Sequence, residues 1–221
     1  GSLSGAGAVY IVQNTFNVGS DNSSTTYTGM ITTNNIVPGT LNKQGTGTFT
    51  LNGSTFAGNE PNFTVSAGIM NVMANYSTTP FSTSGSGILG GTGQTGVTSI
   101  NTGGTLAAGT SPGCITTGVL TLSTGSTFEE EIGGDTACTE YDRTNVNGNA
   151  TLGGANLSVL PSYTPTPGTT YTILETTNGN VIGTFNGLAD GATFTANGIQ
   201  FRINYTNTQV NLTVLGGTLA Q

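Results

Sequence analysis

Short stretches of alternating apolar and polar residues, separated by glycine-containing turns, recur along this chain of 221 residues. Residues 41–53 are the clearest example, because Phe49 and Leu51 fall on one face of an extended strand while Thr48 and Thr50 fall on the other. Looser versions of this pattern occupy residues 65–72, 100–106, 119–128 and 146–157. A two-residue period cut into short pieces by turns predicts many short β-strands.

The composition supports an all-β chain. Threonine outnumbers even the 36 glycines, and charged residues make up 6% of the chain, against about a quarter in an average protein. Threonine suits a pleated strand through its β-branch, and glycine, asparagine and aspartate suit turns that need a positive φ. No stretch of about a dozen residues combines a 3.6-residue apolar period with good helix formers.

The spacing of these stretches, about 20 to 30 residues between residues 1 and 110, lies within the range of solenoid repeats. Each unit alone cannot bury its apolar face, whereas stacked units share a continuous core. We therefore predict a β-solenoid. A sandwich or jelly roll also has many short strands, but it predicts a turn about every 8 to 12 residues without a recurring Gly-Thr-Leu sequence.

Two parts of the solenoid are expected. Residues 1–160 carry the repeats, and residues 161–221 form terminal rungs or a cap, because three prolines interrupt the pattern and aromatic residues then become denser. Phe194, Phe201 and Tyr205 lie close in sequence to the alternating run at 210–215 and suit a terminal rung whose end needs bulky cover. Further ordinary rungs are the alternative.

Charge and hydropathy argue against nucleic-acid binding and against a membrane-spanning helix. The formal net charge is −7, and the basic residues are Lys43, Arg143 and Arg202, so a nucleic-acid backbone would find little to neutralise it. No apolar run approaches about 18 residues, so we expect no membrane-spanning helix in this sequence. Residues 1–20 lack a basic region followed by an apolar core, so we expect any export signal to lie outside this sequence.

The two cysteines, Cys114 and Cys138, are 24 residues apart, and the chain has no histidine to complete a mixed metal site. We predict a disulfide, which would stabilise the fold by roughly 3 kcal/mol in the chain-entropy model and would require an oxidising, exported setting. Two buried free thiols are the alternative.

An acidic cluster is the best candidate for chemistry, because over half of the chain's carboxylates fall within residues 129–142. Three interpretations are open. The carboxylates can offer hard oxygen ligands to Ca²⁺, although the Asp-Gly pattern of calcium loops is missing; a pair of them can serve glycoside hydrolysis; or they form a solvated acidic loop, which we favour. The candidate calcium ligands are Glu129, Glu131, Asp135, Glu140 and Asp142.

Two charged residues carry specific expectations. Glu130 is in phase with Phe128 and Ile132 on the inward face, and a lone buried charge costs several kcal/mol, so we predict that Glu130 lies at a rim or pairs with Arg143. Lys43 is expected to be solvated rather than catalytic. Nucleophilic catalysis has no support, because a serine or cysteine nucleophile generally needs a base and the chain has no histidine.

The ordered series of residues 19–29 and 41–53, followed by 87–93, 104–113 and 141–148, resembles the autotransporter-associated β-strand repeat of bacterial surface proteins and the sequences that follow it. The resemblance is spread over roughly the whole chain. It implies a right-handed parallel β-helix, exported to the cell surface, and it assigns no catalytic residue. This sequence shows no outer-membrane barrel, so secretion by the autotransporter route does not follow from it.

Together these observations predict a non-enzymatic, extracellular structural stalk or adhesin. Its expected partners are a glycan or protein on a host or neighbouring cell, or copies of itself, because the low charge density offers little repulsion. Such contacts can add through multivalency. The alternative is a carbohydrate-active β-helix enzyme that uses the acidic cluster at 129–142. A cleft with two opposed carboxylates and stacking tyrosines would favour the enzyme, and an unbroken convex surface would favour the stalk.

Overall fold

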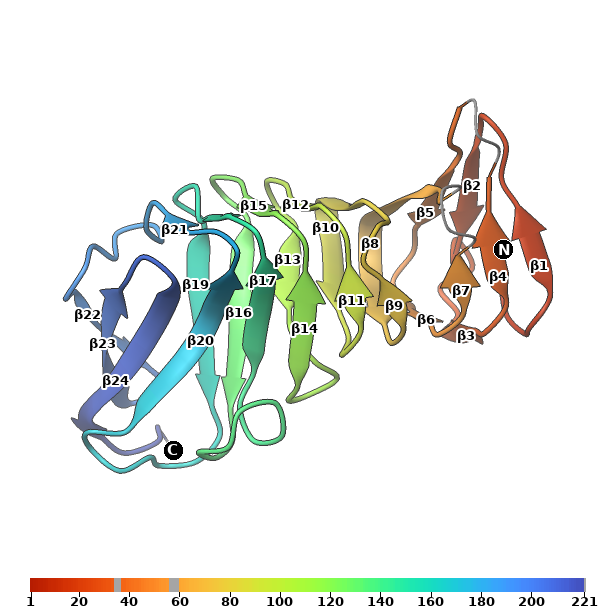
Figure 1. The fold of residues 1–221 in the computed structure, drawn as a ribbon. Helices are drawn as coiled ribbons and strands as arrows, with labels where there is room; N and C mark the ends of the chain where they lie inside the picture. Colours follow the sequence, from red (N-terminus) through yellow and green to blue (C-terminus); the bar gives the residue numbers. More distant parts are fainter. Residues whose placement is uncertain (34–36, 56–59, 221) are drawn as a thin grey trace.

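The computed structural model describes residues 1–33, 37–55 and 60–220. These residues form β-strands and turns without any helix, so none of the described elements is a helix able to cross a membrane. The strands stack along an elongated body, with β1 near one end and the hairpin of β23 and β24 at the other (Figure 1). The all-β part of the prediction is confirmed.

Three sheets share the described strands. The first consists of β1 (Ala8–Tyr10), β4 (Met30–Thr32) and β7 (Ser54–Thr55). The largest contains β2 (Thr15–Val18), β3 (Thr25–Tyr27), β5 (Thr40–Lys43), β6 (Thr48–Leu51), β8 (Asn62–Val72), β10 (Phe81–Gly90), β12 (Thr98–Ile100), β13 (Thr105–Ala107), β15 (Leu120–Leu122), β16 (Thr127–Ile132), β18 (Ala150–Thr151), β19 (Asn156–Pro161) and β21 (Val181–Ile182). The third contains β9 (Asn75–Tyr76), β11 (Gln94–Thr95), β14 (Cys114–Thr117), β17 (Arg143–Asn147), β20 (Thr170–Thr177), β22 (Thr193–Ala196), β23 (Ile199–Tyr205) and β24 (Gln209–Gly217).

Pairing between strands of successive turns of the chain is parallel. Val9 is paired with Ile31, and Phe81 with Thr98. These partners are separated by 22 and 17 residues, and later partners such as Ala150 and Val181 by 31. One turn of chain therefore lies on the next, and identical positions of successive turns form rows across each sheet.

The core is built from inward-facing rows. One row runs through Leu41, Phe63 and Phe81 and continues to Leu120; these side chains are buried. The rings of Phe63 and Phe81 stack with centroids 4.8 Å apart. Because each turn adds its own apolar side chains to such rows, the core extends along the stack, and each turn depends on its neighbours to bury it.

The stretch 41–53 has the expected alternation. Phe49 and Leu51 of β6 are buried, while Thr48 and Thr50 are only partly so. Strands β5 and β6 each pair with β8 rather than with one another, so the residues between them turn a corner of the stack. A side chain at Gly45 would place its Cβ 2.1 Å from the carbonyl oxygen of Gly19, which explains why glycine is required where corners stack this closely.

The expectation that Lys43 is solvated is wrong. Its side chain is fully buried in an inward row between Val18 and Val65. The ammonium Nζ reaches the corner and donates hydrogen bonds to the carbonyl oxygens of Gln44 at 2.7 Å, Gly45 at 2.9 Å and Ala67 at 3.2 Å. Burial lowers the pKa of Lys43. A long aliphatic stem allows lysine to occupy a core row while its ammonium group donates hydrogen bonds to main-chain carbonyl oxygens at the corner.

The C-terminal part changes from parallel to antiparallel pairing. Strand β20 pairs in parallel with β17 on one side and antiparallel with β24 on the other, and β22, β23 and β24 form antiparallel pairs. Phe201 is buried and stacks on the partly exposed Phe194, with ring centroids 5.6 Å apart. The density of aromatic residues beyond Pro161 thus coincides with a different type of strand pairing.

Candidate functional site

A hollow of about 260 Å³ lies on the outer face of the largest sheet. Asn71 pairs with Gly90, and Ala107 pairs with Glu129, so these positions belong to one outward-facing row across β8, β10, β13 and β16. Gly90 and Ala107 carry little or no side chain and form a low floor between bulkier neighbours. The hollow therefore results from two small residues in a row that otherwise carries longer side chains.

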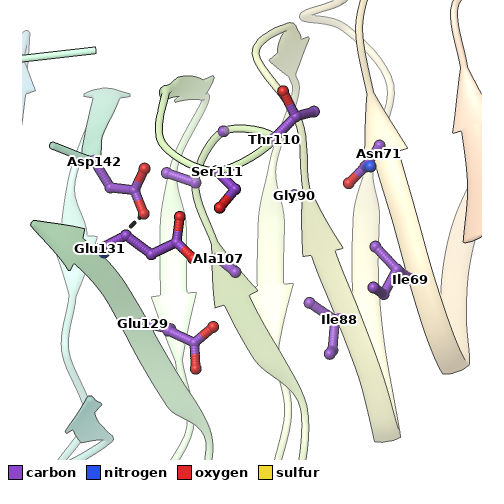
Figure 2. A pocket seen from close by; sticks show the side chains of 12 residues that line it. Ile69, Asn71, Ile88, Gly90, Ala107, Thr110, Ser111, Glu129, Glu131 and Asp142 are labelled. Carbon is purple, nitrogen blue, oxygen red and sulfur yellow. Dashed lines mark hydrogen bonds between the residues drawn. The ribbon is translucent and has the colours of Figure 1, made fainter. Parts of the chain in front are cut away.

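The walls of this hollow differ in chemistry (Figure 2). On one side Ile69 and Ile88, which are paired with one another, present aliphatic side chains. Carboxylates of Glu129, Glu131 and Asp142 line the other side. The loop at 109–111, which follows β13, closes the rim. We call this hollow the acidic groove.

Asp142 holds together three segments at the acidic end. Its Oδ1 accepts a hydrogen bond from the N–H of Gly113 at 2.7 Å, and its Oδ2 accepts one from the N–H of Glu131 at 2.9 Å. Burial raises the pKa of Asp142 to about 6, against the lowering effect of these two hydrogen bonds, and the charges of Glu131 and Glu129 raise it further. The pKa of Asp142 therefore lies well above the ordinary range of an aspartate.

A second hollow, of about 500 Å³, adjoins the first, because Ser111 and Glu131 line both. Its other lining residues include Leu160 of β19 and Asn197 of the turn between β22 and β23. Consecutive strands thus contribute to a path from β8 to β19 across the sheet. None of the described residues that line either hollow is aromatic.

Glu130 lies on the opposite face of β16 from Glu129 and Glu131. As its phase predicts, it points inward, and it is completely buried. The prediction of a rim position or a pair with Arg143 is wrong. Neither carboxyl oxygen of Glu130 has a hydrogen-bond partner among the described residues. Burial raises the pKa of Glu130 well above its ordinary value, and the nearby Asp142 and Glu129 raise it further; protonation thus avoids the cost of a buried charge.

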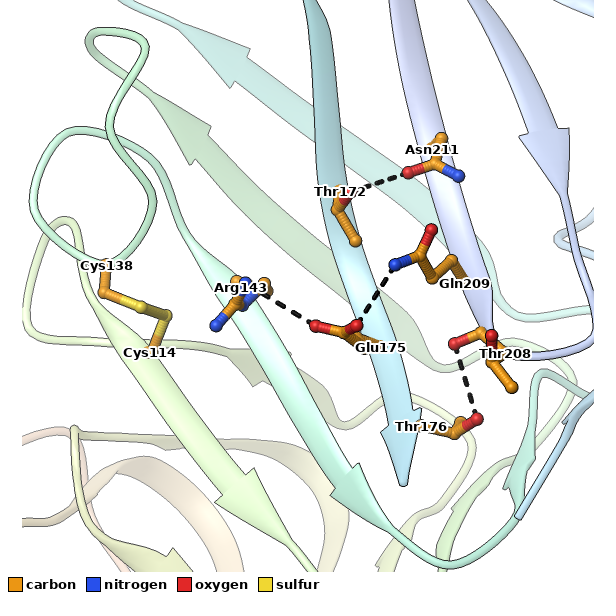
Figure 3. A network of polar contacts seen from close by, with 9 residues as sticks. All are labelled: Cys114, Cys138, Arg143, Thr172, Glu175, Thr176, Thr208, Gln209 and Asn211. Atoms are coloured by element: carbon orange, nitrogen blue, oxygen red, sulfur yellow. Dashed lines mark hydrogen bonds and ion pairs between the residues drawn. A yellow bond between two sulfur atoms is a disulfide. The ribbon is translucent and has the colours of Figure 1, made fainter. Parts of the chain in front are cut away.

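Arg143 does not reach Glu130 because it belongs to β17 in the third sheet and faces β20 there. Its Nη1 lies 3.6 Å from Oε2 of Glu175 (Figure 3). The other oxygen of Glu175, Oε1, accepts a hydrogen bond from Nε2 of Gln209 at 3.1 Å. Glu175 and Arg143 form the only ion pair among the described residues, so the carboxylates of the acidic groove are without a cation partner in that part of the chain.

The burial of Glu130 leads to a testable pH dependence. Because its pKa is raised in the folded protein, the unfolded chain releases a proton that the folded protein keeps, and stability falls as pH rises above the ordinary glutamate pKa of about 4.3. We expect Glu130→Gln to be more stable than the wild type by about 2 kcal/mol at neutral pH and nearly equal to it at acidic pH. Urea unfolding across this pH range measures the difference.

Glu131→Gln is a suitable control, because the partly exposed side chain of Glu131 projects from the opposite face of β16. A constant difference between Glu130→Gln and the wild type at every pH would contradict the assignment of Glu130 as a buried neutral acid. The wild type and Glu130→Gln should both also lose stability between the ordinary aspartate pKa and about pH 6, because the pKa of Asp142 is raised to about 6.

The five predicted calcium ligands do not converge on one point. Asp135 and Glu140 lie in the loop after β16, where their carboxylates already accept hydrogen bonds from other groups of the protein. Glu140 Oε2 accepts hydrogen bonds from the N–H groups of Asp135 and Thr136. Asp135 accepts hydrogen bonds from the hydroxyls of Tyr163 and Tyr171, which lower its pKa. Within residues 1–33, 37–55 and 60–220 no group of three potential metal ligands is placed to hold an ion. Calcium binding stays a prediction.

The predicted disulfide between Cys114 and Cys138 is confirmed (Figure 3). Cys114 begins β14, and Cys138 lies in the loop at 133–140 that also carries Asp135 and Glu140. The bond fastens this loop to the third sheet, close to the start of β17. A disulfide indicates an oxidising, non-cytoplasmic location.

Sequence reasoning found the acidic residues of the groove and missed the rest of it. Ile69, Ile88, Gly90 and Ala107 come from three different turns of the chain, and only the register of the strands brings them together. Comparison of this chain with protein-family models and with curated proteins gives no match.

Proposed function

We propose that this chain is a non-enzymatic segment of an extracellular bacterial surface protein, folded as a right-handed parallel β-helix that acts as a structural stalk or adhesin. The observation that carries the proposal is the continuous parallel pairing from β2 to β21, by which successive turns of chain stack without interruption. The resemblance to autotransporter-associated repeats supports the placement at a bacterial surface.

Three further observations agree with an extracellular stalk. The disulfide suits an oxidising compartment. The outward rows consist mainly of small uncharged side chains, as in the row through Asn42, Thr64 and Ser82. Contacts such as Asn42 Nδ2 to Asn17 Oδ1 at 3.0 Å link one turn to the next. These links order the outer surface without many charges.

A rigid stalk should hold a distal group at one fixed height, whereas a flexible linker lets the group range over many heights. We would display the chain on bacteria between a membrane anchor and a small binding tag, and measure capture by receptors placed at a series of depths in a polymer layer. We expect capture to fall sharply beyond the length of the stack, which is about 35 Å for the strands from β2 to β21 at the usual spacing. With a Gly-Ser linker of equal residue number capture should fall gradually, because a coil samples a broad range of end-to-end distances. Adhesion of cells that lack the tag would identify an adhesin.

The control is a chain with the Phe63→Asp substitution, which buries a charge in the core and should abolish the rod while changing one residue. A dependence of capture on depth equal to that of the linker, together with no adhesion of untagged cells to surfaces or to one another, would overturn both the stalk and the adhesin.

A carbohydrate-active enzyme is the second candidate, because three carboxylates line one groove and the pKa of Asp142 is raised to about 6. Two features weigh against it. The described lining of the groove has no aromatic ring on which a sugar could stack, and both oxygens of Asp142 already accept main-chain hydrogen bonds. Release of reducing sugar from a polysaccharide, lost in Glu129→Gln, would favour the enzyme over the stalk.

A further inference from the structure

The acidic groove combines two kinds of wall that suit one kind of side chain. Ile69 and Ile88 offer an aliphatic surface, while Glu129 and Glu131 offer negative charge on the far side of the Ala107 floor. Strand β10, which carries Ile88, is two strands away from β16, which carries Glu129, a separation of about 10 Å at the usual strand spacing. A long aliphatic stem that ends in a cation matches this arrangement.

The charge of the chain strengthens this match. Its formal net charge is −7, and the single ion pair of the described residues, Arg143 with Glu175, lies on the third sheet. Glu129 and Glu131 are therefore unneutralised by any cation in that part of the chain, and they repel one another: burial and the charge of Glu131 raise the pKa of Glu129. A bound cation would relieve this repulsion.

We propose that the acidic groove binds an extended cationic peptide segment, with the stem of a lysine or arginine along Ile69 and Ile88 and its charged group at Glu129 and Glu131. The adjoining hollow, which shares Ser111 and Glu131, takes the continuation of the same peptide toward Leu160. This inference supplies a partner class for the adhesin proposed above and rests on that function for its biological setting.

A peptide fits the groove better than a glycan does. The two hollows follow one another across strands β8 to β19, so they suit a linear ligand. Aromatic stacking platforms are missing from their described lining, whereas aliphatic and acidic side chains are present in both. Lysine and arginine bury their stems along apolar surface and keep the charge at its edge.

The test uses the purified chain and a fluorescent, end-blocked peptide of alternating lysine and alanine, with binding followed by fluorescence anisotropy. In an extended peptide alternate side chains point the same way, so every lysine of this probe can face the sheet. We expect the Glu129→Gln, Glu131→Gln double variant to bind about tenfold more weakly, from two half-exposed ion contacts of about 0.7 kcal/mol each.

Two matched controls separate the groove from general attraction between opposite charges. The Asp21→Asn, Glu60→Gln variant loses the same amount of charge on the N-terminal side of the stack and should bind like the wild type. A peptide in which diaminopropionate, with one methylene, replaces lysine keeps the charge and loses the stem, and it should bind more weakly to the wild type. A glutamate-alanine peptide should not bind.

A variant that fills the groove tests whether the peptide binds at this site. Ala107→Lys places an amine on the groove floor beside Glu129, its partner on the next strand, and should abolish peptide binding. Thr121→Lys adds the same charge at an exposed position of β15 and should weaken binding far less. Circular dichroism melting shows whether each variant is folded.

The proposal is overturned if the two charge-removal variants bind equally, if the short-stem peptide binds as well as the lysine peptide, or if Ca²⁺ alone at low concentration displaces the peptide completely. Because this assay measures binding in solution, its failure leaves the capture experiment for the stalk unaffected. Conversely, a chain that binds the peptide but shows the same gradual dependence of capture on depth as a Gly-Ser linker would retain the groove and lose the stalk.

Discussion

Replacing Lys43 by methionine should lower the free energy of unfolding by about 4 kcal/mol. Methionine preserves most of the stem that packs in the core row and removes the ammonium. The carbonyl oxygens of Gln44, Gly45 and Ala67 then lose their common donor. Relief of the buried charge offsets part of this loss, because burial already lowers the pKa of Lys43.

The position of these carbonyls explains why the effect should be large. They belong to two successive corners of the stack, after β5 and within β8, so the ammonium of Lys43 fastens one turn of chain to the next. The corner is also crowded, because a Cβ at Gly68 would lie 2.7 Å from Nζ of Lys43. A water molecule that replaced the ammonium would have little room to bridge all three acceptors.

Chemical unfolding of the variant, with Arg202→Met as the matched control, measures this effect. Arg202 is exposed on β23, so its replacement removes the same formal charge without touching the core, and the stability should change by less than about 0.5 kcal/mol. A Lys43→Met protein within about 1 kcal/mol of the wild type would show that the three hydrogen bonds contribute no more than ordinary surface contacts.

Removal of the disulfide through Cys114→Ser and Cys138→Ser together should cost about 3 kcal/mol, because the bond closes a loop of 24 residues in the unfolded chain. The local consequence should be equally clear. Cys138 anchors the loop at 133–140, and that loop precedes Asp142, which ties Gly113 to Glu131 at the acidic end of the groove. Loss of the bond should therefore loosen the groove as well as the fold.

Hydrogen exchange distinguishes the local effect from the global one. In the double serine variant we expect a greater acceleration of exchange at the N–H groups of Gly113 and Glu131 than at Leu41 of β5, which lies several turns away. The wild type in reducing agent is the matched comparison, because it keeps both sulfur atoms. Equal stability of reduced and oxidised protein would contradict the contribution expected from loop closure.

The alternation of residues 41–53 was enough to predict both the strand and the buried face, since Phe49 and Leu51 are buried where the period of two places them. The disulfide also followed from the sequence, because two cysteines in a chain without histidine leave few partners. The inward phase of Glu130 was predictable in the same way. These features depend on local geometry, which extends over only a few residues.

The partners of the buried charges were not predictable. Glu130 was expected to meet Arg143, but β16 and β17 belong to different sheets, and Arg143 faces Glu175 instead. Lys43 was expected to be solvated, yet its side chain lies in a core row. In both cases sequence distance gives no guide, because a residue's neighbours in a stack belong to turns of chain that are 17 to 31 residues away.

The sequence by itself determined the all-β architecture, the alternation of each strand and the supply of carboxylates at 129–142. Only the tertiary structure decided that Gly90 and Ala107 form a floor, that Ile69 and Ile88 form its wall, and that Glu129, Glu131 and Asp142 face it. The physical reason is register. A shift of one residue between neighbouring strands moves every side chain to the opposite face, and that register is set by the packing of whole turns.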